Sequence, residues 1–111
     1  MKKVCVITGA ARGIGLATVN LFLANRFSVV MVDRDSDELK RISKSLDGVY
    51  PIVCDVSQEE DVSNLFNIVD KKFGRLDALI NNAGVAEFGP IEAINFEGWR
   101  RVMSTNLDGV F

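Results

Sequence analysis

The sequence predicts an α/β fold in which helices cover both faces of a parallel sheet. Short apolar runs of strand length alternate with segments of helical periodicity. The apolar runs do not alternate strictly between polar and apolar residues, which indicates strands that are buried on both faces. Strand and helix alternate up to a fourth strand, which a loop and a last helix follow. This order predicts a doubly wound sheet.

Length, composition and charge indicate one soluble globular domain and exclude several function classes. The chain has 111 residues, of which 48 % are hydrophobic and 25 % are charged. No apolar run exceeds four residues, so we expect no membrane span. The apolar stretch after Lys2 and Lys3 stops at Ile7, which is too short for a secretion signal. We expect a cytoplasmic location because both cysteines are expected to be reduced thiols. The formal net charge is −2 and the pI is about 5.1, which gives no basic footprint for nucleic acid.

The chain has no histidine and only two cysteines. The absence of histidine excludes histidine metal ligands, histidine general bases and Ser-His-Asp chemistry. Two thiols cannot supply a four-ligand zinc site, so we expect no metal. Cys5 and Cys54 lie in the first and third strands, about 9.6 Å apart if one strand separates them. A disulfide needs Cα atoms within about 6.8 Å, so both are expected to be buried, reduced thiols.

The first half of the chain holds three expected strands and two expected helices. The first strand covers residues 4–7, and the helix at 14–24 is apolar nearly all round. The second strand covers 27–32. Ser36 is expected to cap a short helix, and the third strand spans 49–54.

A capping box at Ser57–Glu60 predicts the start of the third helix. The apolar residues behind it fall at i, i+3, i+4, i+7 and i+11, and Gly74 is expected as its C-cap; they are Val62, Leu65, Phe66, Val69 and Phe73. The fourth strand covers 77–80, and a loop follows to Ile94. The last helix begins near Asn95 or Phe96 and is expected to reach the end of the chain.

Connection rules predict the strand order 3-2-1-4 within one domain over residues 1–111. Right-handed crossovers and the usual mononucleotide-binding arrangement give this order. Pro51 supports it independently, because it lies in the third strand and proline is tolerated only at a sheet edge.

The turn from the first strand into the first helix has the composition of a phosphate site. Gly9, Gly13 and Gly15 let the backbone turn tightly and let a pyrophosphate approach. The helix N-terminus offers unpaired N–H groups to the anion. The alternative is a tight loop without a ligand. Arg12 either adds charge for a phosphate or is solvated.

Asp33 ends the second strand, eighteen residues after Gly15. An acidic residue at this place binds the adenosine ribose of a dinucleotide. Its carboxylate would repel a 2′-phosphate by about 4 kcal/mol per unit charge at 4 Å and a dielectric of 20. NAD is therefore favoured over NADP, although Arg34 and Arg12 offset part of the repulsion. Alternatively, Asp33 caps the turn of the next helix.

Polar residues also follow the third and fourth strands, at the edge where ligands bind in parallel sheets. Asp55, followed by Val56, could accept a hydrogen bond from an adenine amino group or could simply be a turn residue. Asn81 to Gly84 indicate close approach of the backbone to a ligand, or a plain asparagine-rich turn. Asn106 lies on an otherwise apolar face of the last helix, which we expect to be buried. Its amide must bond a neighbouring backbone, the favoured explanation, or order a water.

Together these stretches resemble the short-chain dehydrogenase/reductase family, over the whole chain. The matching motifs are Thr8-Gly9-x-x-x-Gly13-x-Gly15, Asp33, Asp55-Val56, Asn81-Asn82-Ala83-Gly84 and Asn106-Leu107. The resemblance implies a Rossmann-like fold, a nicotinamide cofactor, and hydride transfer to or from an alcohol or ketone carbon.

The resemblance also implies roles for individual residues. Gly9, Gly13, Ile14 and Gly15 would hold the pyrophosphate side of the cofactor. Asp33 would bind the adenosine ribose.

The later motifs would complete the cofactor site in the same way. Asp55 and Val56 would border the adenine, and Asn82, Ala83 and Gly84 would border the cofactor's ribose. Asn106 resembles the family's catalytic-tetrad asparagine, which positions a water in a proton relay.

The chain departs from the family where the acid–base pair is concerned. The family's Tyr-x-x-x-Lys and its serine lie beyond the asparagine helix, whereas the single tyrosine here, Tyr50, has Cys54 four residues on. We therefore expect a truncated, N-terminal cofactor-binding half that is inactive alone. Its exposed fourth strand or last helix is expected to drive self-association. A stand-alone NAD-binding module and an interaction protein are the alternatives.

Overall fold

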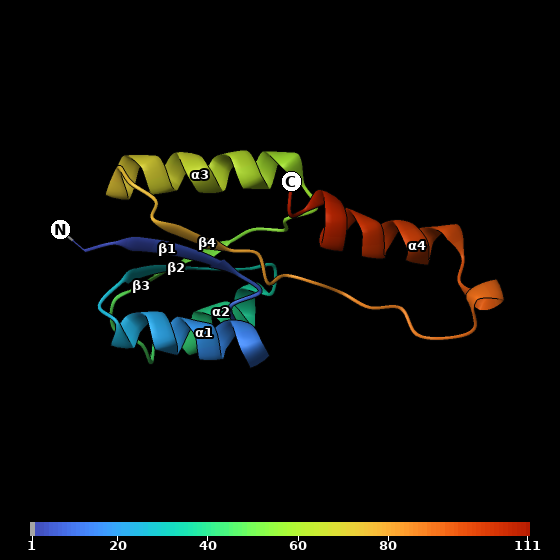
Figure 1. Ribbon diagram of the computed structural model, residues 1–111, viewed down its shortest axis with the longest axis horizontal. Coiled ribbons are helices and arrows are strands. Elements are labelled where there is room, and N and C mark those ends of the chain that lie inside the picture. Colours follow the sequence, from blue (N-terminus) through green and yellow to red (C-terminus); the bar gives the residue numbers. More distant parts are fainter. Residues whose placement is uncertain (1) are drawn as a thin grey trace.

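A computed structural model, which describes residues 2–111, contains one sheet of four parallel strands (Figure 1). The strands are β1 (Val4–Thr8), β2 (Ser28–Asp33), β3 (Val49–Val53) and β4 (Ala78–Ile80). Their order is β3-β2-β1-β4, so the predicted α/β class and strand order are confirmed. Pro51 lies on the outer strand β3, in register with Met31 of β2. Proline, which has no backbone N–H, is tolerated at such an edge.

Helices cover both faces of the sheet. Helices α1 (Gly13–Ala24) and α2 (Ser36–Ser43) lie on one face, and α3 (Glu59–Phe73) lies on the other (Figure 1). Successive strand residues point to opposite faces and both sets are buried. Because residues on both faces of the strands are buried, polar and apolar residues do not alternate along them.

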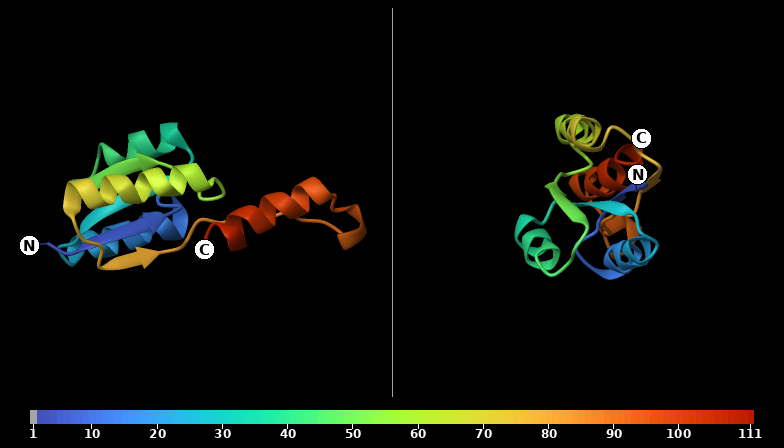
Figure 2. Two further views of the ribbon diagram at one scale, coloured as in Figure 1. Left: turned by 90° about the horizontal axis from the view of Figure 1, so that it is seen from above. Right: turned by 90° about the vertical axis from the view of Figure 1, so that its left-hand side faces the viewer.

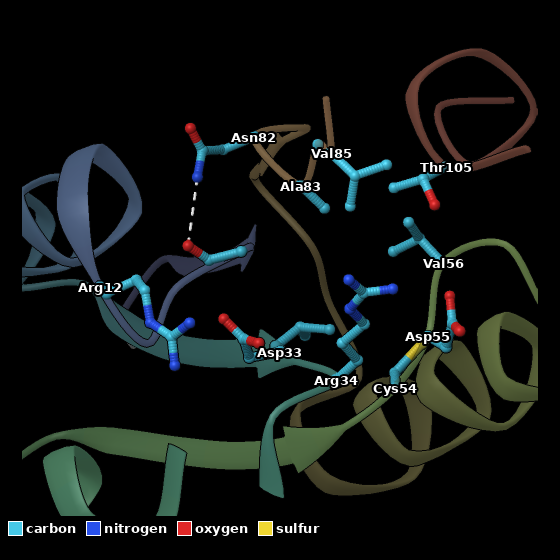
Figure 3. A pocket seen from close by; sticks show the side chains of 13 residues that line it. Arg12, Asp33, Arg34, Cys54, Asp55, Val56, Asn82, Ala83, Val85 and Thr105 are labelled. Atoms are coloured by element: carbon cyan, nitrogen blue, oxygen red, sulfur yellow. Dashed lines mark hydrogen bonds between the residues drawn. The ribbon is translucent and has the colours of Figure 1, made fainter. Parts of the chain in front are cut away.

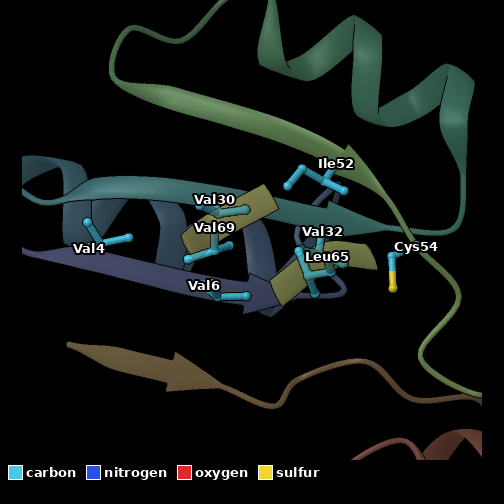
Figure 4. Packing of buried hydrophobic residues seen from close by; sticks show 8 residues of the cluster. All are labelled: Val4, Val6, Val30, Val32, Ile52, Cys54, Leu65 and Val69. Atoms are coloured by element: carbon cyan, nitrogen blue, oxygen red, sulfur yellow. The ribbon is translucent and has the colours of Figure 1, made fainter. Parts of the chain in front are cut away.

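The α3 face and the α1–α2 face each have a continuous apolar core. Leu65 and Val69 of α3 pack on the strands in the first core (Figure 4), whose other members are Val4, Val6, Val30, Val32, Ile52 and, just after β3, Cys54. In the second core, Val19 of α1 and Leu39 of α2 pack on alternate strand residues, namely Cys5, Ile7, Val29 and Met31. These two cores fix the register that aligns the carboxyl ends of the strands.

Cys5 and Cys54 are free and buried, as expected. They belong to the cores on opposite faces of the sheet, which separates them further than the strand spacing alone. Burial raises the pKa of each thiol to about 11, so both stay protonated near neutral pH.

Two expected helix starts are wrong. The N-cap of α2 is Asp35, not Ser36, and its carboxylate accepts the N–H of Glu38 at 3.1 Å. The expected capping box at Ser57 does not form, because both the N–H and the hydroxyl of Ser57 donate to Asp55. Helix α3 therefore starts after Gln58 without a side-chain cap.

The end of α3 is as predicted. Gly74 adopts a left-handed conformation with φ of 67° and returns its N–H to the carbonyl oxygens of Asp70 and Val69.

Residues 81–111 form an arm that extends beyond the carboxyl ends of the strands (Figure 2). After the loop, a short 3-10 turn (Ile91–Ala93) leads to α4 (Phe96–Met103). The prediction that this helix runs to the end of the chain is wrong. It ends at Met103 and is followed by a π-helical turn over Ser104–Asp108. The arm makes the molecule elongated, 52 × 25 × 22 Å.

The face of the last helix that was expected to be buried is largely open. Trp99 and Val110 are each about half exposed, and Asn106 is exposed as well. The segment is helical, as its spacing predicted. However, the arm extends away from both cores, so no element of the described chain covers that face (Figure 2).

A candidate nucleotide site at the carboxyl edge of the sheet

An open hollow of about 280 Å³ lies where the four strands end (Figure 3). Eight residues named from the sequence line it, and they come from four separate segments: Gly9, Arg12, Asp33, Asp55, Val56, Asn82, Ala83 and Gly84. The parallel topology brings these segments to one edge. Gly13, Ile14 and Gly15 lie in the adjoining first turn of α1, and Asn106 lies in the arm.

The glycine turn is compact because one of its contacts excludes any side chain. Gly9 has a φ of 63°, and a Cβ atom on Gly15 would lie 2.0 Å from the carbonyl oxygen of Gly9. The first turn of α1 contains no acidic residue, and its first internal bond runs from Leu16 N–H to Arg12 O. The N–H groups ahead of that bond are therefore available to an anion at the helix N-terminus.

Asp33 ties two turns together at the end of β2. Its Oδ2 accepts the N–H of Ala11 at 3.1 Å, and its Oδ1 accepts the N–H of Asp35 at 3.0 Å. The neighbouring Ala10 N–H donates to Val32 O at 3.0 Å. The helix cap that was the alternative role of Asp33 belongs to Asp35. Asp33 instead stands at the hollow with a fixed carboxylate, since each of its oxygens retains a second lone pair for a ligand.

The β4 end of the hollow is fixed to β1 by Thr8, a role that the sequence did not reveal. The Thr8 hydroxyl oxygen accepts the N–H groups of both Asn82 and Ala83 at 3.0 Å. The Asn82 side chain in turn donates from Nδ2 to Gly9 O at 3.2 Å (Figure 3). Asn82 thus acts through its amide on the glycine turn, and both turns bordering the hollow are held as one unit.

Asp55 is a turn residue that also lies at the hollow. It lines the hollow together with Val56, and its Oδ1 also accepts the Ser57 N–H at 3.0 Å and the Ser57 hydroxyl at 2.7 Å. Its own N–H donates to Asp61 Oδ2 at 3.0 Å. Asp55 is therefore a turn residue whose position at the ligand edge is set by that turn.

Arg12 is neither simply solvated nor free at the hollow. Its Nη2 donates to Asp35 Oδ2 at 2.6 Å, and this pair is solvent-accessible. The Glu38 N–H and then the Arg12 guanidinium lower the pKa of Asp35. The same hydrogen bond raises the pKa of Arg12. Figure 3 shows the Arg12 side chain beside Asp33.

Asn106 bonds a neighbouring backbone, as the favoured explanation had it. Its Nδ2 donates to Val85 O and its Oδ1 accepts the Val85 N–H, both at 2.9 Å. Arg101 adds bonds from Nη2 to Ala86 O and to Glu87 at 2.6 Å. These contacts hold the first residues of the loop against α4 and the π-helical turn, where Thr105 lines the hollow.

Five further residues line the hollow, of which only Arg34 had been considered from the sequence, as a cation near Asp33: Val32, Arg34, Cys54, Val85 and Thr105. Val32 and Cys54 are the last residues of two predicted strands, so their place at the carboxyl edge of the sheet could have been predicted. Nothing in the sequence indicated Val85 or Thr105, because their place depends on how the arm folds back.

Within residues 2–111, no helix is both long and apolar enough to cross a membrane. Nor does any group of three or more His, Cys, Asp or Glu side chains in that range form a potential metal site. The hollow instead offers backbone N–H groups, two carboxylates and two guanidinium groups, a donor and acceptor set that fits a dinucleotide.

The family model described as short chain dehydrogenase matches residues 3–111. An L-fucose dehydrogenase from Oryctolagus cuniculus is 39 % identical over 110 residues, which cover 98 % of this chain and 39 % of that protein. An NADP-dependent (R)-specific alcohol dehydrogenase from Lentilactobacillus kefiri is 36 % identical over 112 residues, 98 % of this chain and 44 % of that one.

A solved structure extends the similarity to three dimensions. The 3-ketoacyl-(acyl-carrier-protein) reductase from Brucella melitensis, complexed with NADH, matches with a TM-score of 0.92 and 34 % identity. The match covers 97 % of this chain and 45 % of that one. The chain spans less than half the length of each of these relatives.

Proposed function

The chain belongs to the short chain dehydrogenase family, and on that premise we propose that it is the NAD-binding part of an oxidoreductase. The reaction proposed is hydride transfer to or from an alcohol or ketone carbon. The observation that carries the proposal is the glycine turn, held by Thr8, Asn82 and Asp33 beside a hollow at the carboxyl edge of the sheet.

The first turn of α1 is proposed to bind the pyrophosphate. Gly9, Gly13, Ile14 and Gly15 present backbone rather than side chain to it, and the free N–H groups at the helix start donate to its oxygens. Nothing lies within 4 Å of where a Cβ of Gly13 would be, so the approach to this turn is open.

Asp33 is proposed to accept hydrogen bonds from the adenosine ribose hydroxyls. A carboxylate at this place disfavours a 2′-phosphate, and Arg12 is already paired with Asp35. Both features support NAD over NADP. Relatives include an NADP-dependent alcohol dehydrogenase as well as a reductase complexed with NADH, so the preference rests on these side chains.

The remaining site residues complete the proposed cofactor site. Asp55 and Val56 border the adenine, and the backbone of Asn82, Ala83 and Gly84 borders the ribose on the other side. The bound nicotinamide dinucleotide supplies the hydride acceptor or donor.

Asn106 is proposed to orient a water at the active site, in the manner of the family's tetrad asparagine. Its Nδ2 and Oδ1 each make one bond to Val85, which holds the loop against the π-helical turn, and each atom keeps one further hydrogen-bonding position for that water.

The 111-residue polypeptide is proposed to bind cofactor without turning over substrate. It has no Tyr-x-x-x-Lys pair, since Cys54 follows Tyr50 at the fourth position. A positioned acid–base group contributes about 10²–10⁴-fold to the rate. A stand-alone NAD-binding module is the second candidate function. A cytoplasmic location is part of the proposal.

Self-association is proposed through the open side of the sheet or through the arm. β4 is an outer strand, and its Leu79 is 40 % exposed. The arm exposes several large apolar side chains: Phe88, Ile91, Phe96, Trp99 and Leu107. Unpaired strand edges and exposed apolar side chains both favour association.

Calorimetric titration with NAD⁺ and NADP⁺ tests the proposal. We expect saturable binding with a preference for NAD⁺, and a smaller preference in Asp33→Asn. Asp47→Asn changes the same charge at an exposed residue just before β3, at the opposite end of the sheet, and should alter neither affinity. Absence of binding, or equal affinities that Asp33→Asn leaves unchanged, would contradict it.

A further inference from the structure

The contact between Arg12 and Asp35 places a paired charge at the rim of the hollow. Arg12 precedes α1 and its side chain makes no capping hydrogen bond, so the side chain is free to reach across the hollow. Its Nη2 donates to Asp35 Oδ2 at 2.6 Å. The guanidinium is thus drawn toward the start of α2, next to the carboxylate of Asp33.

Asp35 is held in position from three directions. Its N–H donates to Asp33 Oδ1 at 3.0 Å, and its Oδ1 accepts the Glu38 N–H at 3.1 Å as the cap of α2. Its other oxygen, Oδ2, accepts from Arg12. One oxygen therefore serves the helix and the other serves the arginine, so the carboxylate need not move to do both.

A guanidinium in this place would otherwise favour a phosphorylated ligand. Arginine binds phosphate through parallel N–H donors, and an unpaired Arg12 beside the ribose pocket would attract a 2′-phosphate. Because Asp35 engages Nη2 and offsets the charge of Arg12, a 2′-phosphate would meet only the remaining N–H donors of a guanidinium that is already paired.

We propose that Asp35 is a specificity-determining positioning residue, which holds Arg12 away from a 2′-phosphate and so favours the dinucleotide that lacks one. The inference rests on the proposed function and deepens it. It separates two contributions to cofactor choice: Asp33 repels the phosphate directly, whereas Asp35 withdraws Arg12, one of the two cations at the hollow that would compensate.

The decisive variant is Asp35→Asn, because asparagine still caps α2 but carries no charge. The dissociation constants for NAD⁺ and NADP⁺ are measured by calorimetry at low ionic strength, and circular dichroism verifies folding. We expect the ratio of the NADP⁺ to the NAD⁺ constant to fall about fivefold, the equivalent of about 1 kcal/mol. Asp37→Asn removes an exposed charge from the same helix turn and should leave the ratio unchanged.

Arg12→Gln, alone and combined with Asp35→Asn, completes a double-mutant cycle. Alone, it should change the ratio by less than about twofold, because its charge is already engaged. Combined with Asp35→Asn, it should remove most of the fivefold shift. A large loss of NADP⁺ binding in Arg12→Gln alone would show that Arg12 is free, and would overturn the inference.

The outcomes separate this inference from the proposed function. If the parent chain binds NAD⁺ but Asp35→Asn leaves the ratio unchanged, or shifts it equally with and without Arg12, the inference fails and the function stands. If the parent chain binds neither dinucleotide, the proposed function fails and the inference falls with it.

Discussion

The hydroxyl oxygen of Thr8 accepts the backbone N–H of Asn82 at 3.0 Å, across the boundary between β1 and β4. It also accepts the next N–H, that of Ala83, at the same distance. One side chain at the end of a central strand thereby fixes the segment that leaves the outer strand. Because Asn82 then bonds Gly9, the geometry of the glycine turn depends on this hydroxyl.

Replacing Thr8 by valine is expected to destabilise the fold and to weaken NAD⁺ binding. The variant keeps the shape of the side chain but leaves two partly buried N–H groups without a partner, at a cost of about 1–3 kcal/mol each. Urea unfolding measures the change in the free energy of unfolding. Thr8→Ser retains the hydroxyl and should stay close to the parent chain; an equal loss in both variants would contradict the role assigned to the hydroxyl.

Gly15→Ala is expected to disrupt the nucleotide site more than Gly13→Ala does. A Cβ on residue 15 would lie 2.0 Å from Gly9 O, so the turn must shift, which we expect to cost at least about 2 kcal/mol. At Gly13 a Cβ meets nothing within 4 Å, and only the positive φ is penalised, by about 1–2 kcal/mol.

Thermal unfolding and NAD⁺ titration of the two glycine variants measure this difference. If Gly13→Ala were the more damaging to stability, the packing argument would be wrong.

The sequence predicted the sheet and the clustering of segments because both depend on periodicity and on topology. The apolar runs, the edge proline and the strand-end motifs each reflect a constraint that is local in sequence. Once the strands are parallel and ordered, Asp33, Asp55 and Asn82 must meet at one edge.

What the sequence did not reveal depends on choices between nearly equivalent polar contacts. Ser36 and Asp35 are both residue types that favour an N-cap, and Asp35 takes that role. Ser57 fits the capping-box pattern, but its hydroxyl donates to Asp55 instead. The exposure of Trp99 and the site contact of Thr105 depend on where the arm lies, which no helical periodicity encodes.

Cys54 should react slowly with thiol reagents despite lining the hollow. Burial first, and then the charges of Asp61 and Asp55, raise the pKa of its thiol to about 11. Since the thiolate is the reactive form, only about one thiol in a thousand is ionised at pH 8. The rate of iodoacetamide modification should rise about tenfold per pH unit up to that pKa.

Peptide mapping of the alkylated protein distinguishes Cys54 from Cys5. A rate that levels off near pH 8.5, the range of an ordinary thiol, would mean that Cys54 is not buried as described.

A charge on the arm is expected to reduce self-association. Trp99→Lys places an ammonium on the exposed apolar face of α4, which should disfavour burial of that face against a second copy. Sedimentation velocity over a range of concentrations gives the association state. Leu21→Lys, at an exposed position on α1, is the matched control and should behave as the parent chain.

Leu79→Lys tests the other proposed route, because lysine on an outer strand discourages edge pairing. A parent chain that stays monomeric at every concentration would contradict both routes.

Amide chemical shifts of the ¹⁵N-labelled protein during NAD⁺ titration test the central claim most directly. The largest changes are expected at Gly13, Ile14 and Gly15, and further changes at Asp33 and Val56, because the dinucleotide lies across the carboxyl edge of the sheet. Lys3 and Gly48, at the opposite edge, should not shift. Saturable changes confined to that opposite edge, or no changes at the α1 start, would contradict the account.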